Sequence, residues 1–221
     1  MHPHSGIATL TFVMTGNLRY EDTTGKSGVL PAGGVEWMRS GNGVWHIGAP
    51  VGDVPMSGFQ LWVALPPTEE NAHAQSLYLA PSDVPQVGPA RVLLGSYGNS
   101  RSRIPAPSGM NYLAVNLKDG ERWQYTPPAG HTVAWLAVSA GQLDVHEMIG
   151  TGELAVFEES DRIIDAVAHG DTTFVLGSAV KHPHDLVTGY YSVHTNKAAL
   201  AQGEAEIERI AAELRRDKRI G

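Results

Sequence analysis

The sequence predicts an all-β protein with two small barrel domains and one C-terminal helix. Three observations lead to this prediction. A chain of 221 residues is long enough for two small domains. Its 25 glycines and 14 prolines are spread along the whole length, and short segments of alternating hydrophobicity recur between them. Many short strands separated by turn signals are typical of β-sandwiches and small barrels.

The clearest strand is predicted at residues 7–14, where apolar side chains alternate with threonines. One side of this strand carries Ala8, Leu10, Phe12 and Met14, and the other carries Thr9 and Thr11. This alternation is the period of a half-buried strand. Shorter runs predict further strands at residues 35–38, 59–65, 91–94, 112–117, 133–138, 154–157 and 173–176.

Two less regular segments interrupt the strands and indicate where the domains meet. Residues 66–87 are rich in proline and polar side chains, which predicts an extended surface segment. Residues 99–109 are similarly irregular and predict the interdomain linker. We therefore expect an N-terminal domain at 1–104 and a C-terminal domain at 105–221.

Only the C-terminal segment, residues 197–216, has the periodicity of a helix. Asn196 is a suitable N-cap for it, because its side-chain oxygen can accept a hydrogen bond from a free backbone N–H group. The apolar positions of this helix are Leu200, Ile207, Ile210, Ala211 and Leu214. We expect this stripe to pack on the surface of a barrel.

The composition excludes several classes of function. There are no cysteines, which excludes disulfides and thiolate metal sites, so any metal must bind to His, Asp or Glu. The net charge of -7 opposes direct binding of nucleic acid. No apolar run reaches the ~20 residues of a membrane span, and the N-terminus does not have the pattern of a signal peptide. We therefore expect a cytoplasmic protein.

The sharpest chemical feature is His2-Pro3-His4. Two histidines at i and i+2 on an extended strand project to the same side and can reach one metal ion. A third histidine, His46, follows a turn-rich segment. His-x-His alone is a weak signal, because the end of a chain is often frayed and solvated. A second motif, His182-Pro183-His184, has no partner at a matching spacing and predicts a solvated loop.

The surroundings of the three histidines strengthen the case for a site. Residues 25–34 fit the pattern Gly-x5-Pro-x-Gly and precede His46. From His2 to His46 the sequence resembles the pirin family of the cupin superfamily. The matching landmarks are His2-Pro3-His4, Gly6, Gly16, Gly25, Gly28, Pro31, Gly33, Trp37-Met38, Gly41, Gly43 and His46. This resemblance implies two tandem cupin-type (jelly-roll) β-barrels with a C-terminal α-helix.

The resemblance also implies a metal site in the first barrel. Its ligands would be His2, His4 and His46, holding Fe(II) or another divalent transition metal. Pirins have a glutamate two residues after the third histidine, and Gly48 occupies that position here. We expect weak metal binding for this reason, since the anionic ligand is missing. The nearest carboxylates in the sequence are Glu36 and Asp53, and no spacing argument brings either to the site.

Two functions follow from the resemblance. One is an iron-dependent dioxygenase that cleaves flavonols such as quercetin, with a flavonoid-like small molecule as substrate and catalytic residues other than the metal ligands unknown. The other is a non-catalytic regulatory protein with a weakened or empty metal site and a protein partner. An acidic surface is compatible with basic partner proteins.

Pirins have additional residues before His-Pro-His, which form the opening strands of the first barrel. We therefore expect a first barrel that lacks this segment, with unpaired strand edges and with Leu10, Phe12 and Met14 uncovered. Two copies that pair such edges would bury this surface, which predicts a homo-oligomer.

Overall fold

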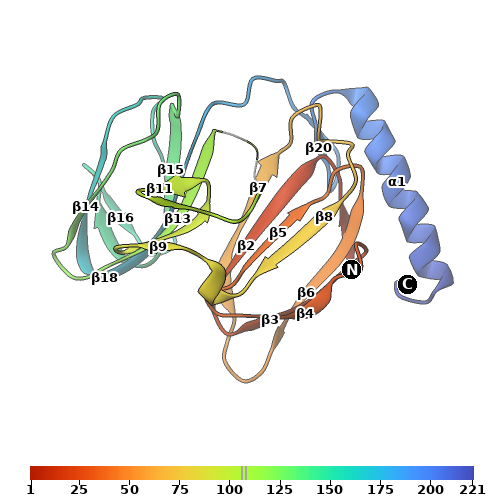
Figure 1. Cartoon of the computed structure of the whole chain (residues 1–221), viewed down its shortest axis with the longest axis horizontal. Coiled ribbons are helices and arrows are strands. Elements are labelled where there is room, and N and C mark those ends of the chain that lie inside the picture. The colour runs from red at the N-terminus through yellow and green to blue at the C-terminus, as the bar shows by residue number, and fades with distance from the viewer. Residues whose placement is uncertain (106, 108) are drawn as a thin grey trace. The chain divides into compact units, whose positions relative to one another are not determined.

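The computed structural model of the protein describes residues 1–105, 107 and 109–221 (Figure 1). Residues 106 and 108 belong to the predicted linker and lie outside the described residues. The chain forms two compact units, one of residues Met1–Asp83 with His182–Gly221, the other of Val84–Lys181.

The first unit contains two antiparallel four-stranded sheets. Its strands are β1 (His2–His4), β2 (Ile7–Thr15), β3 (Asn17–Asp22), β4 (Ser27–Pro31), β5 (Val35–Arg39), β6 (Val44–Val51), β7 (Ser57–Ala64) and β8 (Gln75–Leu79), followed by the 3-10 turn η1 (Pro81–Asp83). One sheet has the order β1-β6-β3-β4 and the other β7-β2-β5-β8. Val13 of β2 packs with Leu18 of β3 and Leu30 of β4, so apolar side chains join the two sheets.

The predicted strand at residues 7–14 is confirmed as β2, but its predicted alternation is wrong. Thr9, expected on the outer side, is as fully buried as Leu10. Strand β2 is an inner strand between β5 and β7, and both of its faces are shielded from solvent at residues 7–10. Gly6 lies between β1 and β2 with a φ of 75°, and the chain passes there from one sheet to the other. The face of β1 therefore does not continue into β2.

The C-terminal helix α1 (Lys197–Arg216) has the predicted bounds. The side chain of Asn196 accepts a hydrogen bond from the Ala199 N–H group at 2.9 Å, as an N-cap does. Its buried positions are Gly203, Ile207, Ile210, Ala211 and Leu214. Trp45 of β6 donates from Nε1 to the Ile207 carbonyl at 3.0 Å, which fastens the helix to the first unit. Two short strands, β19 (Val187–Thr188) and β20 (Val193–His194), precede it.

The second unit is built around two long strands, β15 (Val133–Asp144) and β18 (Ile164–Ala179). The other strands are β9 (Gln86–Val87), β10 (Ala90–Leu94), β11 (Ser96–Tyr97), β12 (Ser100–Arg101), β13 (Met110–Leu117), β14 (Arg122–Tyr125), β16 (Met148–Gly150) and β17 (Leu154–Val156). Strand β18 pairs with β13, β14 and β15, and its neighbours enclose one apolar core that includes Leu136 and Phe174.

The predicted all-β class with one C-terminal helix is confirmed, but the compact units have other bounds than the predicted domains. Strand β10 pairs with β13 in the sheet of the second unit, and residues 84–104 belong to that unit. Helix α1 packs with the first unit through Trp45. The segment 66–87 is not wholly irregular either, because it contains β8, which pairs with β5. Within the described residues, no helix has both the length and the apolar character that a membrane crossing requires.

The expected exposure of apolar side chains on β2 is not found. Leu10 and Phe12 are buried within the single chain, and Met14 is half-buried. Strands β1 and β7 are nevertheless end strands, each paired on one side only among the described residues. An unpaired strand edge can pair with another chain.

The predicted homo-oligomer therefore stays a prediction that now rests on these edges alone. We expect light scattering on dilute protein to give at least twice the mass of one chain. A monomeric mass together with a single cooperative melt would contradict the predicted homo-oligomer. The chain would then be stable although the edges of β1 and β7 stay unpaired and exposed to water.

Candidate metal centre

The pairing of β1 with β6 brings the three predicted histidines together. His2 lies directly opposite His46 in this antiparallel ladder, and His4 follows on the same side of β1. The ring centroids of His2 and His46 are 4.3 Å apart, and that of His4 lies 4.9 Å from the first and 5.1 Å from the second. One nitrogen atom of each ring lies within 4.8 Å of the others, which is a suitable arrangement for one shared metal ion.

The Nε2 atoms of the three histidines have different surroundings from the Nδ1 atom of His4. The Nε2 atoms of His2 and His46 are 2.9 Å apart, and Nε2 of His4 is buried without a hydrogen-bond partner. In contrast, Nδ1 of His4 donates to the Tyr191 carbonyl at 3.1 Å. A buried nitrogen without a partner is costly unless something binds it. The donor set and this free nitrogen fit a divalent transition metal.

His2 and His4 can bind metal without losing a proton. Burial, followed by the neighbouring His46, lowers the pKa of His2 to about 4. Burial is also the main cause that lowers the pKa of His4 to about 4, and the Tyr191 carbonyl opposes this shift. Neutral imidazoles are the form that ligates metals.

Glu36, on β5, lies beside the cluster, although the sequence provided no spacing argument for it. It is 3% exposed, and its Oε1 atom is 3.8 Å from Nδ1 of His46. Its position in the sequence could have identified it, since Glu36 stands between Val35 and Trp37 in a buried strand. A carboxylate in such a strand requires a partner, because burying an unpaired charge is costly. Asp53, the other carboxylate considered, is exposed.

A tyrosine hydroxyl joins Glu36 to a second buried carboxylate. Tyr78 of β8 donates to Asp22 Oδ2 at 2.9 Å and to Glu36 Oε1 at 3.2 Å. Burial and the two carboxylates raise the pKa of Tyr78, so its hydroxyl stays protonated. Burial opposes ionisation of Asp22, but hydrogen bonds from Thr24, Ser76 and Tyr78 outweigh this and lower the pKa of Asp22. The single Tyr78 hydroxyl proton is thus shared between the two carboxylates, with the shorter contact to Asp22.

Gly48 follows His46 by two residues on β6 and therefore lies on the same side of the strand. It offers no ligand. A Cβ atom built there would lie 3.0 Å from Leu18 Cδ1, the end of a flexible side chain. The position could therefore accept a longer side chain after a small movement of Leu18.

A cavity of about 440 Å³ adjoins His2 in the first unit. Its walls include aromatic and apolar side chains, and two glutamates of α1 also line it. The lining residues are Met1, His2, Pro3, Trp45, Tyr190, Tyr191, Ser192, Glu204, Ile207 and Glu208. The volume is in the range of small-molecule sites. Trp45 is thus part of a cavity wall, whereas Trp37 is a core residue and Trp62 is 45% exposed.

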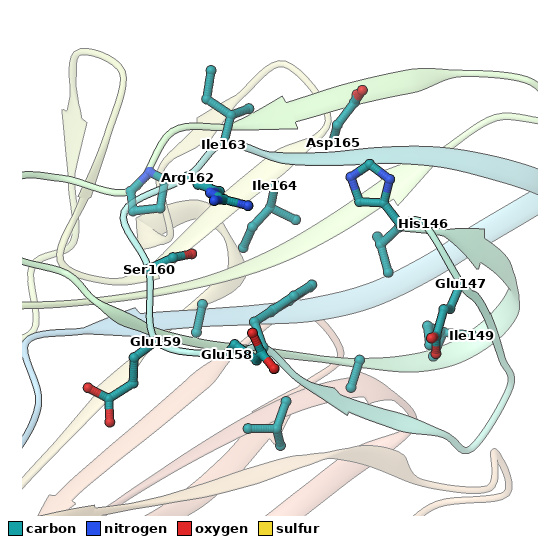
Figure 2. Close-up of a pocket in the computed structure, with 16 residues that line it drawn as sticks. His146, Glu147, Ile149, Glu158, Glu159, Ser160, Arg162, Ile163, Ile164 and Asp165 are labelled. Atoms are coloured by element: carbon teal, nitrogen blue, oxygen red, sulfur yellow. The ribbon is translucent and has the colours of Figure 1, made fainter.

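A second cavity, of about 590 Å³, lies in the second unit (Figure 2). Its lining includes the apolar side chains of Ile149 and Phe157 and the charged side chains of Glu147, Glu158 and Arg162. His182 and His184 lie in a loop, in agreement with the predicted solvated segment. In the part of the chain that the structure describes, His2, His4 and His46 are the only group of three potential metal ligands that lie together.

Known proteins share sequence similarity with this chain. Residues 1–63 match the family model described as Pirin. A Pseudomonas aeruginosa protein named "Putative quercetin 2,3-dioxygenase" is 32% identical over 196 residues, which cover 82% of this chain and 68% of that protein. Human pirin is 27% identical over 171 residues, which cover 73% of this chain and 59% of that protein. The chain thus spans only part of the length of these relatives.

Solved structures show the same fold. The crystal structure of a quercetin 2,3-dioxygenase from Acinetobacter baumannii superposes with a TM-score of 0.86 at 22% identity, covering 94% of this chain and 76% of that chain. The Escherichia coli pirin YhhW in complex with nickel(II) gives a TM-score of 0.66 at 19% identity, covering 81% and 75%. The predicted pair of cupin-type barrels is confirmed by this likeness.

We expect the substitution His46→Ala to abolish metal uptake, because His46 lies opposite His2 and contributes one of three converging nitrogens. Metal uptake is measured by elemental analysis of protein that has been purified without an affinity tag and loaded with Ni²⁺. The matched control is His184→Ala, which removes an imidazole from the other His-Pro-His motif and should leave uptake unchanged. Equal metal content in the His46 variant and the parent would contradict the site.

Proposed function

Because this chain belongs to the pirin family of the cupin superfamily, we propose that it binds a divalent transition metal and cleaves a flavonol-like substrate with dioxygen. Its metal ligands are His2, His4 and His46. The observation that carries this proposal is the convergence of three imidazoles beside a cavity with aromatic walls. A related protein and a structural neighbour are named for the quercetin 2,3-dioxygenase reaction.

The metal would supply the site at which dioxygen and substrate meet, and the chain's own residues would hold the substrate. Flat aromatic ligands stack favourably on aromatic side chains. Trp45, Tyr190 and Tyr191 contribute such rings to the cavity that adjoins His2. A flavonol is a planar polyphenol, and the cavity of about 440 Å³ has the size of small-molecule sites.

Two carboxylates could accept a proton from a substrate hydroxyl group. Glu204 and Glu208 of α1 both line this cavity, whereas Glu36 does not. Gly48 occupies the position where pirins have a glutamate, so this carboxylate is missing from the metal site. A base on the helix would take over this role without being a metal ligand. We place the protein and this reaction in the cytoplasm.

The test of this function is oxygen consumption. Protein loaded anaerobically with Fe²⁺ and mixed with quercetin in air-saturated buffer should consume oxygen while the absorbance of the flavonol falls. Metal-free protein and the His46→Ala variant serve as controls. If iron-loaded protein consumes oxygen no faster than these controls, the protein is not a quercetin dioxygenase.

A variant of the cavity wall tests the substrate site separately. Tyr190 is 86% exposed and lines the cavity, so Tyr190→Ala should leave the fold and the metal content unchanged. Loss of one stacking contact should raise KM for quercetin by about 2- to 10-fold. Steady-state kinetics measure the change. An unchanged KM would mean that the substrate binds elsewhere.

The second candidate is a non-catalytic protein-binding role, and the second unit favours it. Two exposed apolar side chains line the cavity of Figure 2, Val156 (75%) and Ile163 (54%). Met148 of β16 (49%) and Leu154 of β17 (60%) are also exposed, next in sequence to residues that line it. Strand β17 pairs with β15, and no described strand pairs with its other edge. Exposed apolar patches and free strand edges are both typical of protein-binding surfaces.

The charge at this cavity favours a basic partner. Two of its carboxylates have cationic partners, Asp165 with Arg122 and Glu159 with Lys181. Glu147 and Glu158 have no ion pair within the described part of the chain, and they exceed in number the one arginine, Arg162, that lines the cavity with them. An extended segment that alternates apolar and basic side chains would pair with β17 and face these glutamates.

We expect a hexapeptide of alternating valine and lysine to bind the second unit more tightly than one of valine and glutamate. Amide chemical-shift changes in a titration should cluster at residues 154–156. The variant Val156→Ser, which alters an exposed side chain, should weaken the interaction. Equal binding of the two peptides would exclude charge recognition at this surface.

A further inference from the structure

We infer that Glu36 is a positioning residue for the metal centre: it orients His46 and supplies the negative charge that Gly48 does not. This inference rests on the proposed metal site and adds a residue that lies outside its three-histidine ligand set. Glu36 belongs to the sheet β7-β2-β5-β8, whereas His46 belongs to the other sheet of the same unit. The contact therefore spans the interior between two sheets.

Glu36 and the candidate metal position lie at opposite ends of the His46 ring. The Nδ1 atom of His46 is 3.8 Å from Glu36 Oε1, within ion-pair distance but longer than a direct hydrogen bond. The Nε2 atom of His46 is 2.9 Å from Nε2 of His2. Glu36 is therefore placed to act through the ring of His46, and not as a ligand in its own right.

A carboxylate at Nδ1 selects one tautomer of His46. An ionised carboxylate accepts hydrogen bonds and cannot donate them, so it favours the proton on Nδ1. The lone pair of His46 then lies on Nε2, on the side of His2. Metal-binding histidines commonly have such a partner on the other nitrogen, which fixes the ring and makes it a stronger ligand.

His4 shows the same arrangement with a different acceptor. Its Nδ1 atom donates to the Tyr191 carbonyl, and its Nε2 atom is buried and free. Two of the three rings thus have an oxygen atom near Nδ1, at hydrogen-bond distance for His4 (3.1 Å) and at ion-pair distance for His46 (3.8 Å). In the metal-free chain, the pair of Nε2 atoms at 2.9 Å requires a single proton between them. If His46 carries its proton on Nδ1, this shared proton comes from His2.

The surroundings of Glu36 hold its carboxylate in this position. Its side chain is 4% exposed and accepts a hydrogen bond from the Tyr78 hydroxyl at 3.2 Å. Tyr78 in turn is held by Asp22 and by stacking on Tyr20, with ring centroids 3.5 Å apart. A buried carboxylate next to the cluster compensates part of the charge of a divalent ion, which three neutral imidazoles do not.

The first experiment uses the unmodified chain. Long-range ¹⁵N–¹H NMR of histidine-labelled, metal-free protein at neutral pH reports which ring nitrogen carries the proton. We expect His46 to be protonated at Nδ1. A predominant Nε2–H tautomer of His46 would overturn the inference. This readout does not depend on catalysis, so it stands even if quercetin turnover is absent.

The second experiment measures Ni²⁺ affinity by competition with a chelator. Glu36→Gln should weaken binding about 10- to 100-fold, the usual effect of losing such a partner, and should give a mixed tautomer population at His46. The control Glu69→Gln removes a carboxylate of the same unit that pairs with Arg39, and it should change neither readout. Unchanged affinity and tautomer in the folded Glu36 variant would refute the role.

A rescue experiment separates charge from orientation. Adding Gly48→Glu to the Glu36→Gln variant restores a carboxylate on the same side of β6 as His46. We expect the Ni²⁺ affinity to recover by at least 10-fold, while the tautomer population of His46 in the metal-free form stays mixed. X-ray absorption of the Ni²⁺-loaded parent that shows direct ligation by Glu36, lost in the Glu36→Gln variant, would overturn the positioning role.

Discussion

The antiparallel register between β1 and β6 is the constraint on which the candidate metal centre depends. It sets His2 opposite His46 and leaves His4 on the same side of the short strand β1. A slip by one residue would turn one strand's side chains to the opposite face and separate the histidines. Gly6 ends β1 with a positive φ, and a Cβ atom there would lie 2.0 Å from the Val193 carbonyl oxygen. Only glycine fits this turn.

Buried polar contacts fasten the segment before α1 to the same region. Ser5 Oγ is 2.9 Å from His194 Nε2, and His194 Nδ1 is 3.3 Å from Glu70 Oε2. This order of contacts resembles a catalytic triad. All three residues are at most 2% exposed, so no substrate can reach Ser5 and the contacts serve the fold. They also hold the neighbourhood of Tyr191, whose carbonyl accepts the hydrogen bond from His4.

The two units use the same architecture for different interiors. The second unit encloses an apolar core of residues such as Leu136, Phe174 and Leu176, in which packing supplies the stability. The first unit buries three carboxylates, Asp22, Glu36 and Glu70, whereas the buried polar residues described in the second unit include no carboxylate. Buried polar groups lower stability unless they are paired, so such an interior is typical of a functional site. The buried carboxylates thus distinguish the unit that holds the candidate metal centre.

The amino-acid sequence by itself determined the all-β class, the bounds of α1 and the three histidines, because these depend on local periodicity and short spacing. Only the tertiary structure decided which carboxylate meets His46. Glu36 reaches it from the opposite sheet, and such a contact depends on how two sheets face each other. The sequence also did not determine that Thr9 is buried or that β10 pairs within the second unit. Both depend on non-local strand pairing, which leaves no periodic signal in the sequence.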